Sequence, residues 1–159
     1  MRRIGLFLAL GGGLLPLAVS GCMRSSDASV AEAGNAVASD ARAALERGAR
    51  ELGATGQAPR LTGDTISDCD DGGRRRSVYG RAAFPPGPYL DATLDRGVDY
   101  FIALASERGY RLDRPPSGSD GVRLRRIVLA RDRPAAHLDL RLHGGRRPYL
   151  EVRGQTDCL

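Results

Sequence analysis

The fold is decided by the stretch AHLDLRLH at residues 136–143, in which apolar and polar side chains alternate without a break. Successive side chains of a β-strand point to opposite faces, so the three leucines share one face and His137, Asp139, Arg141 and His143 share the other. A strand with one apolar and one polar face is typical of an antiparallel sheet that covers a core on one side only. The stretch therefore predicts such a sheet, with one open face.

Similar patterns predict further strands in the second half of the chain, joined by turns rich in Gly and Pro. The expected strands are 77–84, 122–130, 149–153 and a short one at 110–112. In the strand 122–130 we expect Val122 and Leu124 to point inward, and Arg123 and Arg125 to point outward. The pair formed by Arg125 and Arg126 breaks this alternation, which indicates a bulge or a change to burial on both faces.

Two segments have apolar residues at helical spacing. The segment 89–108 has a continuous apolar face, and Gly109 ends it. The segment 27–52 is rich in Ala, and its thin apolar stripe is interrupted by Gly34 and Gly48. We therefore expect a well-packed helix at 89–108 and, at 27–52, either a loosely packed helix or a separate stalk.

Strands and helices are segregated along the chain, and the last strands are joined by short connections. This order is typical of the α+β class rather than of alternating parallel α/β folds. We expect an antiparallel sheet of about four to five strands, packed on one main helix, with an N-terminal Ala-rich helix in addition.

The first residues have the pattern of an export signal. Arg2 and Arg3 precede an uncharged apolar run at 4–19, which is shorter than the roughly 20 residues of a membrane span. The run ends in LAVSGC at 17–22, which resembles the lipobox of bacterial lipoproteins. The resemblance covers about the first 22 residues and implies cleavage before Cys22, with lipid on its sulfur. An ordinary signal peptide with an incidental cysteine, or an uncleaved anchor, is the alternative.

The lipobox resemblance and the linker pattern of 53–63, with Gly53, Gly56 and Pro59, indicate a division of the chain, and the resemblance also implies a location. Residues 1–21 would be the signal peptide, 22–63 a lipidated tether with the Ala-rich helix and a linker, and 64–159 an α+β extracytoplasmic domain. Lipid at Cys22 would hold the protein on the outer face of the cell membrane, since two or three acyl chains anchor durably. The layout is similar to that of small exported lipoproteins of the actinobacterial kind.

Two cysteines are left once Cys22 carries lipid. Export to an oxidising compartment favours a disulfide between Cys69 and Cys158. The alternative makes Cys69 a metal ligand together with the neighbouring aspartates of the segment 68–71. One thiolate beside carboxylates, without a second Cys or a His at metal-site spacing, is a poor zinc set. We therefore expect a disulfide, with no metal and no other cofactor.

The charge balance argues against nucleic-acid binding. The formal net charge is +5, and without Arg2 and Arg3 the remaining chain has 22 basic and 19 acidic side chains. A net charge of +3 in so mixed a sequence is too weak to indicate a nucleic-acid surface. All basic residues are arginines, so catalysis through a lysine Schiff base is excluded.

The sequence favours a binding protein over an enzyme. No nucleophile motif is present, and His137 and His143 lie roughly 20 Å apart on a regular strand, too far to share a metal. An envelope hydrolase that uses His137 and Asp139 as an acid–base pair is the alternative. We expect a non-enzymatic protein that binds or scaffolds an envelope protein, a cell-wall polymer or anionic lipid. The candidate binding surface consists of Arg123, Arg141, Tyr149 and Arg153.

Overall fold

The computed structural model describes residues 23–119 and 123–159, so the leader, Cys22 and Val122 lie outside the described residues. The described chain forms two helices and seven strands. In chain order these are α1 (Met23–Glu51), β1 (Leu61–Asp68), β2 (Arg74–Ala83), α2 (Leu90–Ser106), β3 (Arg111–Leu112), β4 (Ser117–Ser119), β5 (Leu124–Asp132), β6 (Ala135–His143) and β7 (Tyr149–Thr156). Neither described helix is long and apolar enough to cross a membrane.

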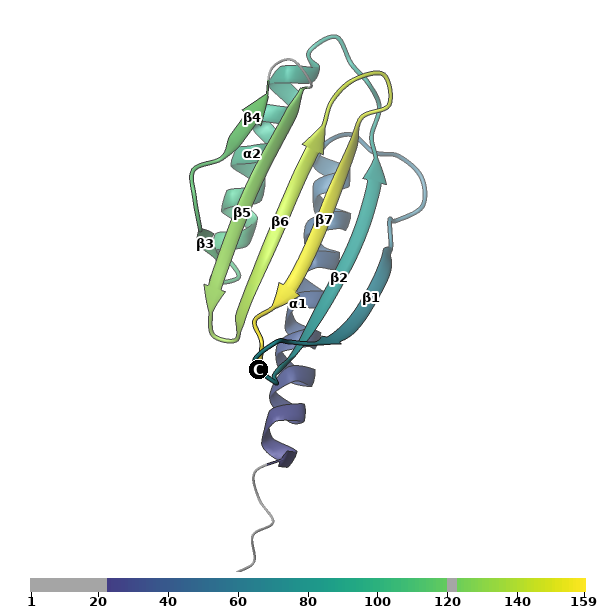
Figure 1. Cartoon of the computed structure of the whole chain (residues 1–159). Helices are drawn as coiled ribbons and strands as arrows, with labels where there is room; N and C mark the ends of the chain where they lie inside the picture. The colour runs from purple at the N-terminus through teal and green to yellow at the C-terminus, as the bar shows by residue number, and fades with distance from the viewer. Residues whose placement is uncertain (1–22, 120–122) are drawn as a thin grey trace, which may run out of the picture.

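All strands belong to one antiparallel sheet in the order β1-β2-β7-β6-β5-β3, with β4 also paired to β5. Both helices lie on the same side of the sheet, α1 behind β2 and β7 and α2 behind β5 (Figure 1). The α+β class and the helix-covered antiparallel sheet are therefore confirmed. The sheet is larger than expected, because β1 and β4 form in segments that had no strand pattern.

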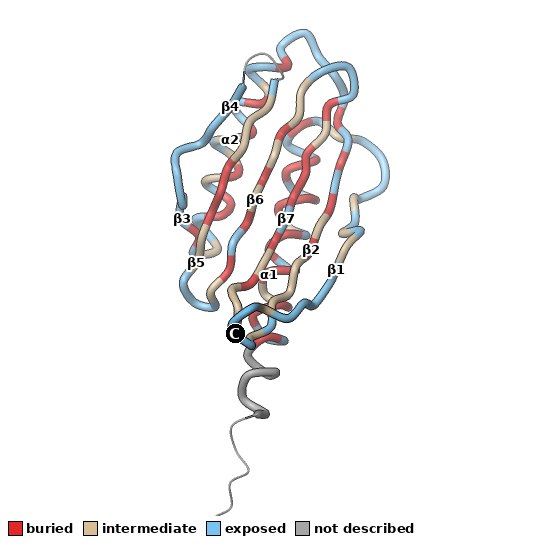
Figure 2. The backbone as a smooth tube through the Cα atoms, viewed as in Figure 1, coloured by how far each residue is buried: buried red, intermediate tan, exposed pale blue. Residues whose placement is uncertain are grey.

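The core lies between the sheet and the two helices. Leu138, Leu140 and Leu142 of β6 are almost fully buried, as are Leu150 and Val152 of β7, which confirms the inward faces expected for these strands. Figure 2 shows the same alternation as red and paler segments along β6 and β7. Neither of the two described helices lies over the opposite face of the sheet (Figure 1).

Helix α1 packs tightly against the sheet from Val30 onward, contrary to the loose packing expected from its sequence. Val37, Ala41 and Leu45 are completely buried. A Cβ atom on Gly48 would clash with Cζ of Phe101, so the glycine leaves space for that ring. The interruptions of the apolar stripe are therefore points of close approach. The first turns of α1 extend past the end of the sheet at which the C-terminus lies (Figure 1).

The alternation expected for the start of β5 was wrong by one residue, whereas the expected change to burial on both faces is confirmed at Ile127, Val128 and Leu129. The register pairs Leu124 with His143 and continues without a bulge to the end of the strand, so Leu124 and Arg126 lie on the open face. Arg125 points toward α2, where its Nε lies 2.8 Å from Oδ1 of Asp95. A long arginine on the helix side of the sheet can still reach solvent and an acidic partner. The period-two pattern of the sequence does not reveal this.

A disulfide between Cys69 and Cys158 connects the turn between β1 and β2 to the C-terminus, as expected. The two sulfurs and a carboxylate oxygen of Asp71 lie within 4.8 Å of one another. Because the sulfurs are bonded to each other, neither is a thiolate that could bind a metal. The acidic turn thus carries a covalent link between the two ends of the domain.

Candidate binding face

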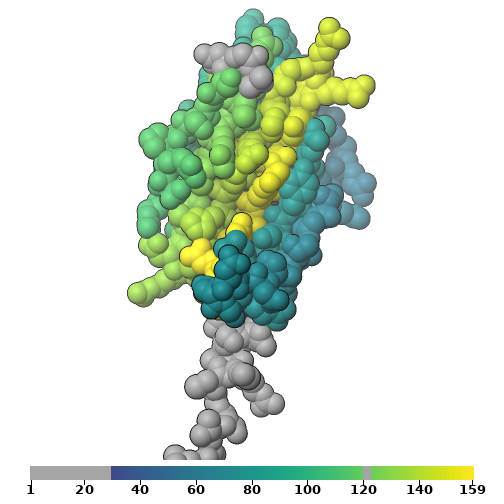
Figure 3. All heavy atoms as spheres, viewed as in Figure 1, coloured from purple at the N-terminus to yellow at the C-terminus, as the bar shows by residue number. Residues whose placement is uncertain are grey.

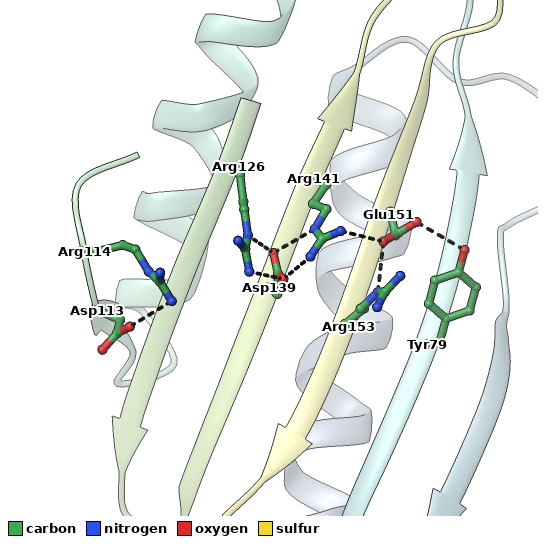
Figure 4. A network of polar contacts seen from close by, with 8 residues as sticks. All are labelled: Tyr79, Asp113, Arg114, Arg126, Asp139, Arg141, Glu151 and Arg153. Atoms are coloured by element: carbon green, nitrogen blue, oxygen red, sulfur yellow. Dashed lines mark hydrogen bonds and ion pairs between the residues drawn. The ribbon is translucent and has the colours of Figure 1, made fainter. Parts of the chain in front are cut away.

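The open face of the sheet brings together charged and aromatic side chains from β2, β5, β6 and β7. Figure 3 views the molecule from this side, with the side chains of the sheet exposed to the viewer. At its centre lies a charge network, which we define as Arg126, Asp139, Arg141, Glu151 and Arg153 (Figure 4). The cross-strand register aligns Arg126, Arg141 and Glu151 on three neighbouring strands. The alternation of all three strands therefore directs the network to one face.

Asp139 is held between two arginines. Its carboxylate oxygens accept hydrogen bonds from Nε and Nη2 of Arg126 at 3.0 and 2.8 Å, and from Nε and Nη2 of Arg141 at 3.3 and 2.9 Å. Burial acts to raise the pKa of Asp139, but these hydrogen bonds outweigh it and leave the pKa below its ordinary value. Asp139 is therefore ionised at neutral pH, and it fixes both guanidinium groups in place.

Glu151 is only 8% exposed although it lies on the face without helices. Nε of Arg153 donates to Glu151 Oε1 at 2.9 Å, and Nη1 of Arg141 lies 3.9 Å from the same oxygen. The hydroxyl of Tyr79 donates to Oε2 at 3.4 Å. A buried carboxylate is costly unless it is paired in this way. Glu151 thus orders the side chains that cover it.

Three aromatic and cationic groups form a stack beside the network. Cζ of Arg81 lies 3.2 Å from the ring centroid of Tyr149, and the ring of His143 is stacked on Tyr149 at 4.1 Å and 12°. Nε2 of His143 is buried and has no hydrogen-bond partner among the described residues. Burial lowers the pKa of His143, and the charges of Arg81 and Arg141 lower it further against the opposing effect of Glu151. The imidazole is therefore neutral at pH 7.

The face carries more positive than negative charge. The charge network holds three arginines for two carboxylates, and Arg81 adds a fourth guanidinium without a carboxylate partner among the described residues. Ion pairs and stacking fix these groups before any ligand arrives. A rigid, positively charged surface is suited to oxyanions, because arginine binds carboxylate or phosphate through two parallel hydrogen bonds.

The structure brings together three of the four residues expected to form a binding surface. Arg141, Tyr149 and Arg153 share the open face. Arg123 does not join them: it lies in the turn before β5, and its Nε is 3.5 Å from Oδ1 of Asp91 on α2. Like Arg125, Arg123 is paired with an aspartate of α2.

Sequence reasoning missed three members of the face, Tyr79, Arg81 and Arg126. Tyr79 and Arg81 alternate with buried Val78 and Ala82 in a strand that was expected, so the period-two pattern of β2 was the available signal. Arg126 was missed because the phase of β5 was wrong.

His137 and Asp139 do not form a pair. Nε2 of His137 lies 2.9 Å from Oδ1 of Asp157, whereas both oxygens of Asp139 are occupied by arginines. A general base needs a lone pair directed at substrate, and a general acid needs a proton that it can give up. The arrangement at Asp139 favours charge positioning over proton transfer.

The chain matches no protein-family model, and no curated protein resembles it closely enough in sequence to count as a relative. Its function is therefore inferred from the chemistry of its own residues.

Proposed function

We propose that this protein is a non-enzymatic lipoprotein, anchored at the outer face of the cell membrane, that binds an anionic component of the envelope through its open sheet face. The observation that carries the proposal is the fixed excess of guanidinium groups over carboxylates on a face that neither described helix covers. Most of these groups are already ordered by Asp139 and Glu151. Binding therefore costs little side-chain entropy.

The anchor is proposed from the lipobox resemblance at residues 17–22. Helix α1 begins at Met23, the residue after Cys22, and continues into the core without interruption. Lipid on Cys22 would thus be joined to the domain by a helix rather than by a flexible linker. A helix of this kind limits how the domain turns relative to the bilayer.

The direction of α1 indicates which way the open face is turned. The helix runs along the strands, and its first turns extend past the end of the sheet that carries the C-terminus (Figure 1). With acyl chains at Cys22, that end faces the bilayer and the strands stand upright on it. The open face is then turned sideways, toward envelope components beside the domain. This orientation favours a polymer or a protein over lipid headgroups.

A binding role also agrees with the partners of the two residues on which a hydrolase would depend. Asp139 is held by Arg126 and Arg141, and His137 is paired with Asp157. Replacement of His137 by Ala is therefore expected to leave the phenotype of the cell unchanged. A loss of an envelope hydrolase activity in this variant would favour the enzyme instead.

The anchor is tested by replacing Cys22 with Ser. We expect the variant to lose its lipid and to leave the membrane fraction, and we expect mass spectrometry of the wild-type protein to find an acylated Cys22 at the mature N-terminus. Normal processing and membrane sedimentation of Cys22→Ser would contradict the lipid anchor.

The face is tested by crosslinking in intact cells. A photocrosslinking amino acid replaces His137 on the open face and, as a control, Arg96 on the exposed side of α2. We expect an envelope component to be captured from position 137 only. Arg153→Gln, which removes one charge from the network, should reduce this capture strongly. Equal capture from both positions, or capture unaffected by Arg153→Gln, would contradict a role for the open face.

A further inference from the structure

The stack at Arg81 has the geometry of a prepared anion-binding group. An aromatic ring has two faces, and the close approaches of Arg81 and His143 to the centroid of Tyr149 require opposite faces. The guanidinium carbon thus lies over one face of the ring, and the imidazole covers the other face. A guanidinium stacked on a ring keeps its N–H groups in its own plane above the ring, so they can donate sideways past the ring edge.

No carboxylate of the described chain takes up these donors. Glu151 is the cross-strand neighbour of Arg81, but its oxygens are occupied by Arg153 and Tyr79. Arg81 is exposed to solvent. Asp139 and Glu151 each neutralise arginines of the charge network, whereas Arg81 keeps its full charge. The group is therefore fixed in position and electrostatically unsatisfied.

Two more arginines precede Tyr149 in the chain. Arg146 and Arg147 are exposed in the loop between β6 and β7, and neither has a carboxylate partner among the described residues. The loop meets the end of β2, since N of Phe84 donates to O of Pro148 at 3.2 Å. Arg81 is one of the last three residues of the same strand. Three arginines without a carboxylate partner among the described residues are thus carried at one end of the sheet, which we call the distal end.

The distal end is opposite to the end at which α1 begins (Figure 1). If Cys22 carries lipid, the three arginines are at the part of the domain farthest from the bilayer. Surface charge on a membrane is screened within about a Debye length, roughly 8 Å at physiological salt. Lipid headgroups of the same membrane are therefore poor candidates for the ligand, and a polymer that extends away from the membrane is favoured.

We propose that the distal end is a binding site for an anionic envelope polymer that carries a phosphate or carboxylate on each repeating unit. Arg81 binds one such group through two parallel hydrogen bonds, and Arg146 and Arg147 bind neighbouring units. This inference rests on the proposed function, because it assigns a ligand class and a location to the same face.

The site is tested with the lipidated full chain in a neutral detergent. The probes are polyphosphate and polygalacturonate, which separate phosphate from carboxylate chemistry. Arg81→Lys keeps the charge but loses the two-pronged donor, and Tyr149→Ala removes the platform. We expect each variant to bind about tenfold more weakly to the preferred polymer. Tyr149→Phe, which keeps the ring, and Arg133→Gln, which removes one charge at the other end of the sheet, should bind like the wild type.

Thermal melting of each variant is measured in parallel, and only variants with an unchanged melting temperature are compared. Wild-type affinity in Arg81→Lys would overturn the site, because the two-pronged donor would then not be needed. A loss of affinity in Arg133→Gln equal to that in Arg81→Lys would also overturn it, because the attraction would then depend on charge alone. Loss of polymer binding when phosphatidylglycerol, but not phosphatidylcholine, is mixed into the detergent micelles would show that lipid headgroups occupy the site, and would overturn the polymer as ligand. If the Arg81 variants bind normally while Arg153→Gln still abolishes crosslinking, the distal site fails and the proposed function stands.

Discussion

Asp40 of α1 accepts a hydrogen bond of 2.7 Å from Nη1 of Arg131 on β5, although the two residues are 91 positions apart. The same carboxylate accepts from Arg108 at 2.6 Å and from the hydroxyl of Tyr110 at 3.1 Å. Burial raises the pKa of Tyr110 well above its ordinary value, so the phenol keeps its proton and donates it. One buried acid therefore holds α1 against the end of β5 and the segment after α2.

Replacement of Asp40 by Ala is expected to lower the free energy of unfolding by about 3–5 kcal/mol, because Arg131 would be left in a buried site without a counter-charge. The side chain of Arg131 is only 11% exposed, so water cannot replace the lost partner well. Urea denaturation measures the change. The control is Asp64→Ala, which breaks a half-exposed pair with Arg76 and should cost about 1 kcal/mol or less. Equal effects in the two variants would contradict a special role for Asp40.

The disulfide is expected to contribute a large share of the stability. Cys69 and Cys158 are separated by 89 residues, and closing so long a loop removes much entropy from the unfolded chain. We expect Cys69→Ser/Cys158→Ser to be less stable by about 4 kcal/mol in urea. The wild type in dithiothreitol should unfold at the same urea concentration as this variant. A reduced wild type as stable as the oxidised one would show that the link adds nothing.

The parts of the structure that were predicted from sequence are those in which one periodicity runs without interruption. The leucines of β6 alternate strictly with charged residues, so both its buried and its open face were assigned correctly. The pattern of this strand, together with that of β7, was enough to predict that Arg141, Tyr149 and Arg153 share one face. The apolar face of α2 was equally continuous.

The parts that were missed lack such a pattern for physical reasons. Strand β1 is an edge strand, mostly exposed and containing Gly63, so it needs no apolar face. In β5, Arg125 faces the helix layer but reaches Asp95, so that a helix-facing position carries a charge. In α1 the small residues make the apolar stripe look weak in the sequence. In the structure they allow the helix to approach the sheet closely. In β1, β5 and α1, contacts between residues far apart in the sequence therefore determine the structure.

Gly48 gives a direct test of the close approach of α1. In an exposed helix position Gly→Ala would stabilise by about 1 kcal/mol. At Gly48 the new methyl group would meet the ring of Phe101, which is 1% exposed and has no space to move. We therefore expect Gly48→Ala to destabilise the domain by about 1–3 kcal/mol, as measured by thermal or urea unfolding.

The matched control for Gly48→Ala is Gly87→Ala. No atom lies within 4 Å of the Cβ position at Gly87, and its φ is not positive. This substitution should leave stability unchanged or raise it slightly, because it restricts the unfolded chain. If Gly48→Ala behaved like Gly87→Ala, the helix would not be packed against Phe101 as described.

The stability of the domain should fall at mildly acidic pH because of His143. Its pKa is lower in the folded protein than the ordinary value of about 6.5, since burial disfavours the charged imidazole. Below pH 6.5 the unfolded chain takes up a proton before the folded protein does, and the equilibrium moves toward unfolding. The contribution of His143 is therefore complete above pH 6.5 and is lost as the pH falls toward the folded-state pKa. Urea unfolding at several pH values between 7 and 5 measures how the free energy of unfolding depends on pH.

His143→Gln separates this effect from the titration of the carboxylates. The variant loses the stacking on Tyr149, so it should be less stable than the wild type at pH 7, but its stability should change little between pH 7 and 5. The folded-state pKa of Asp139 is lowered by Arg126 and Arg141, so the stability that it contributes is lost only as the pH falls below the ordinary carboxyl range. The two groups thus act in separate pH windows. If the free energy of unfolding of His143→Gln still fell between pH 7 and 5, another titrating group would be responsible.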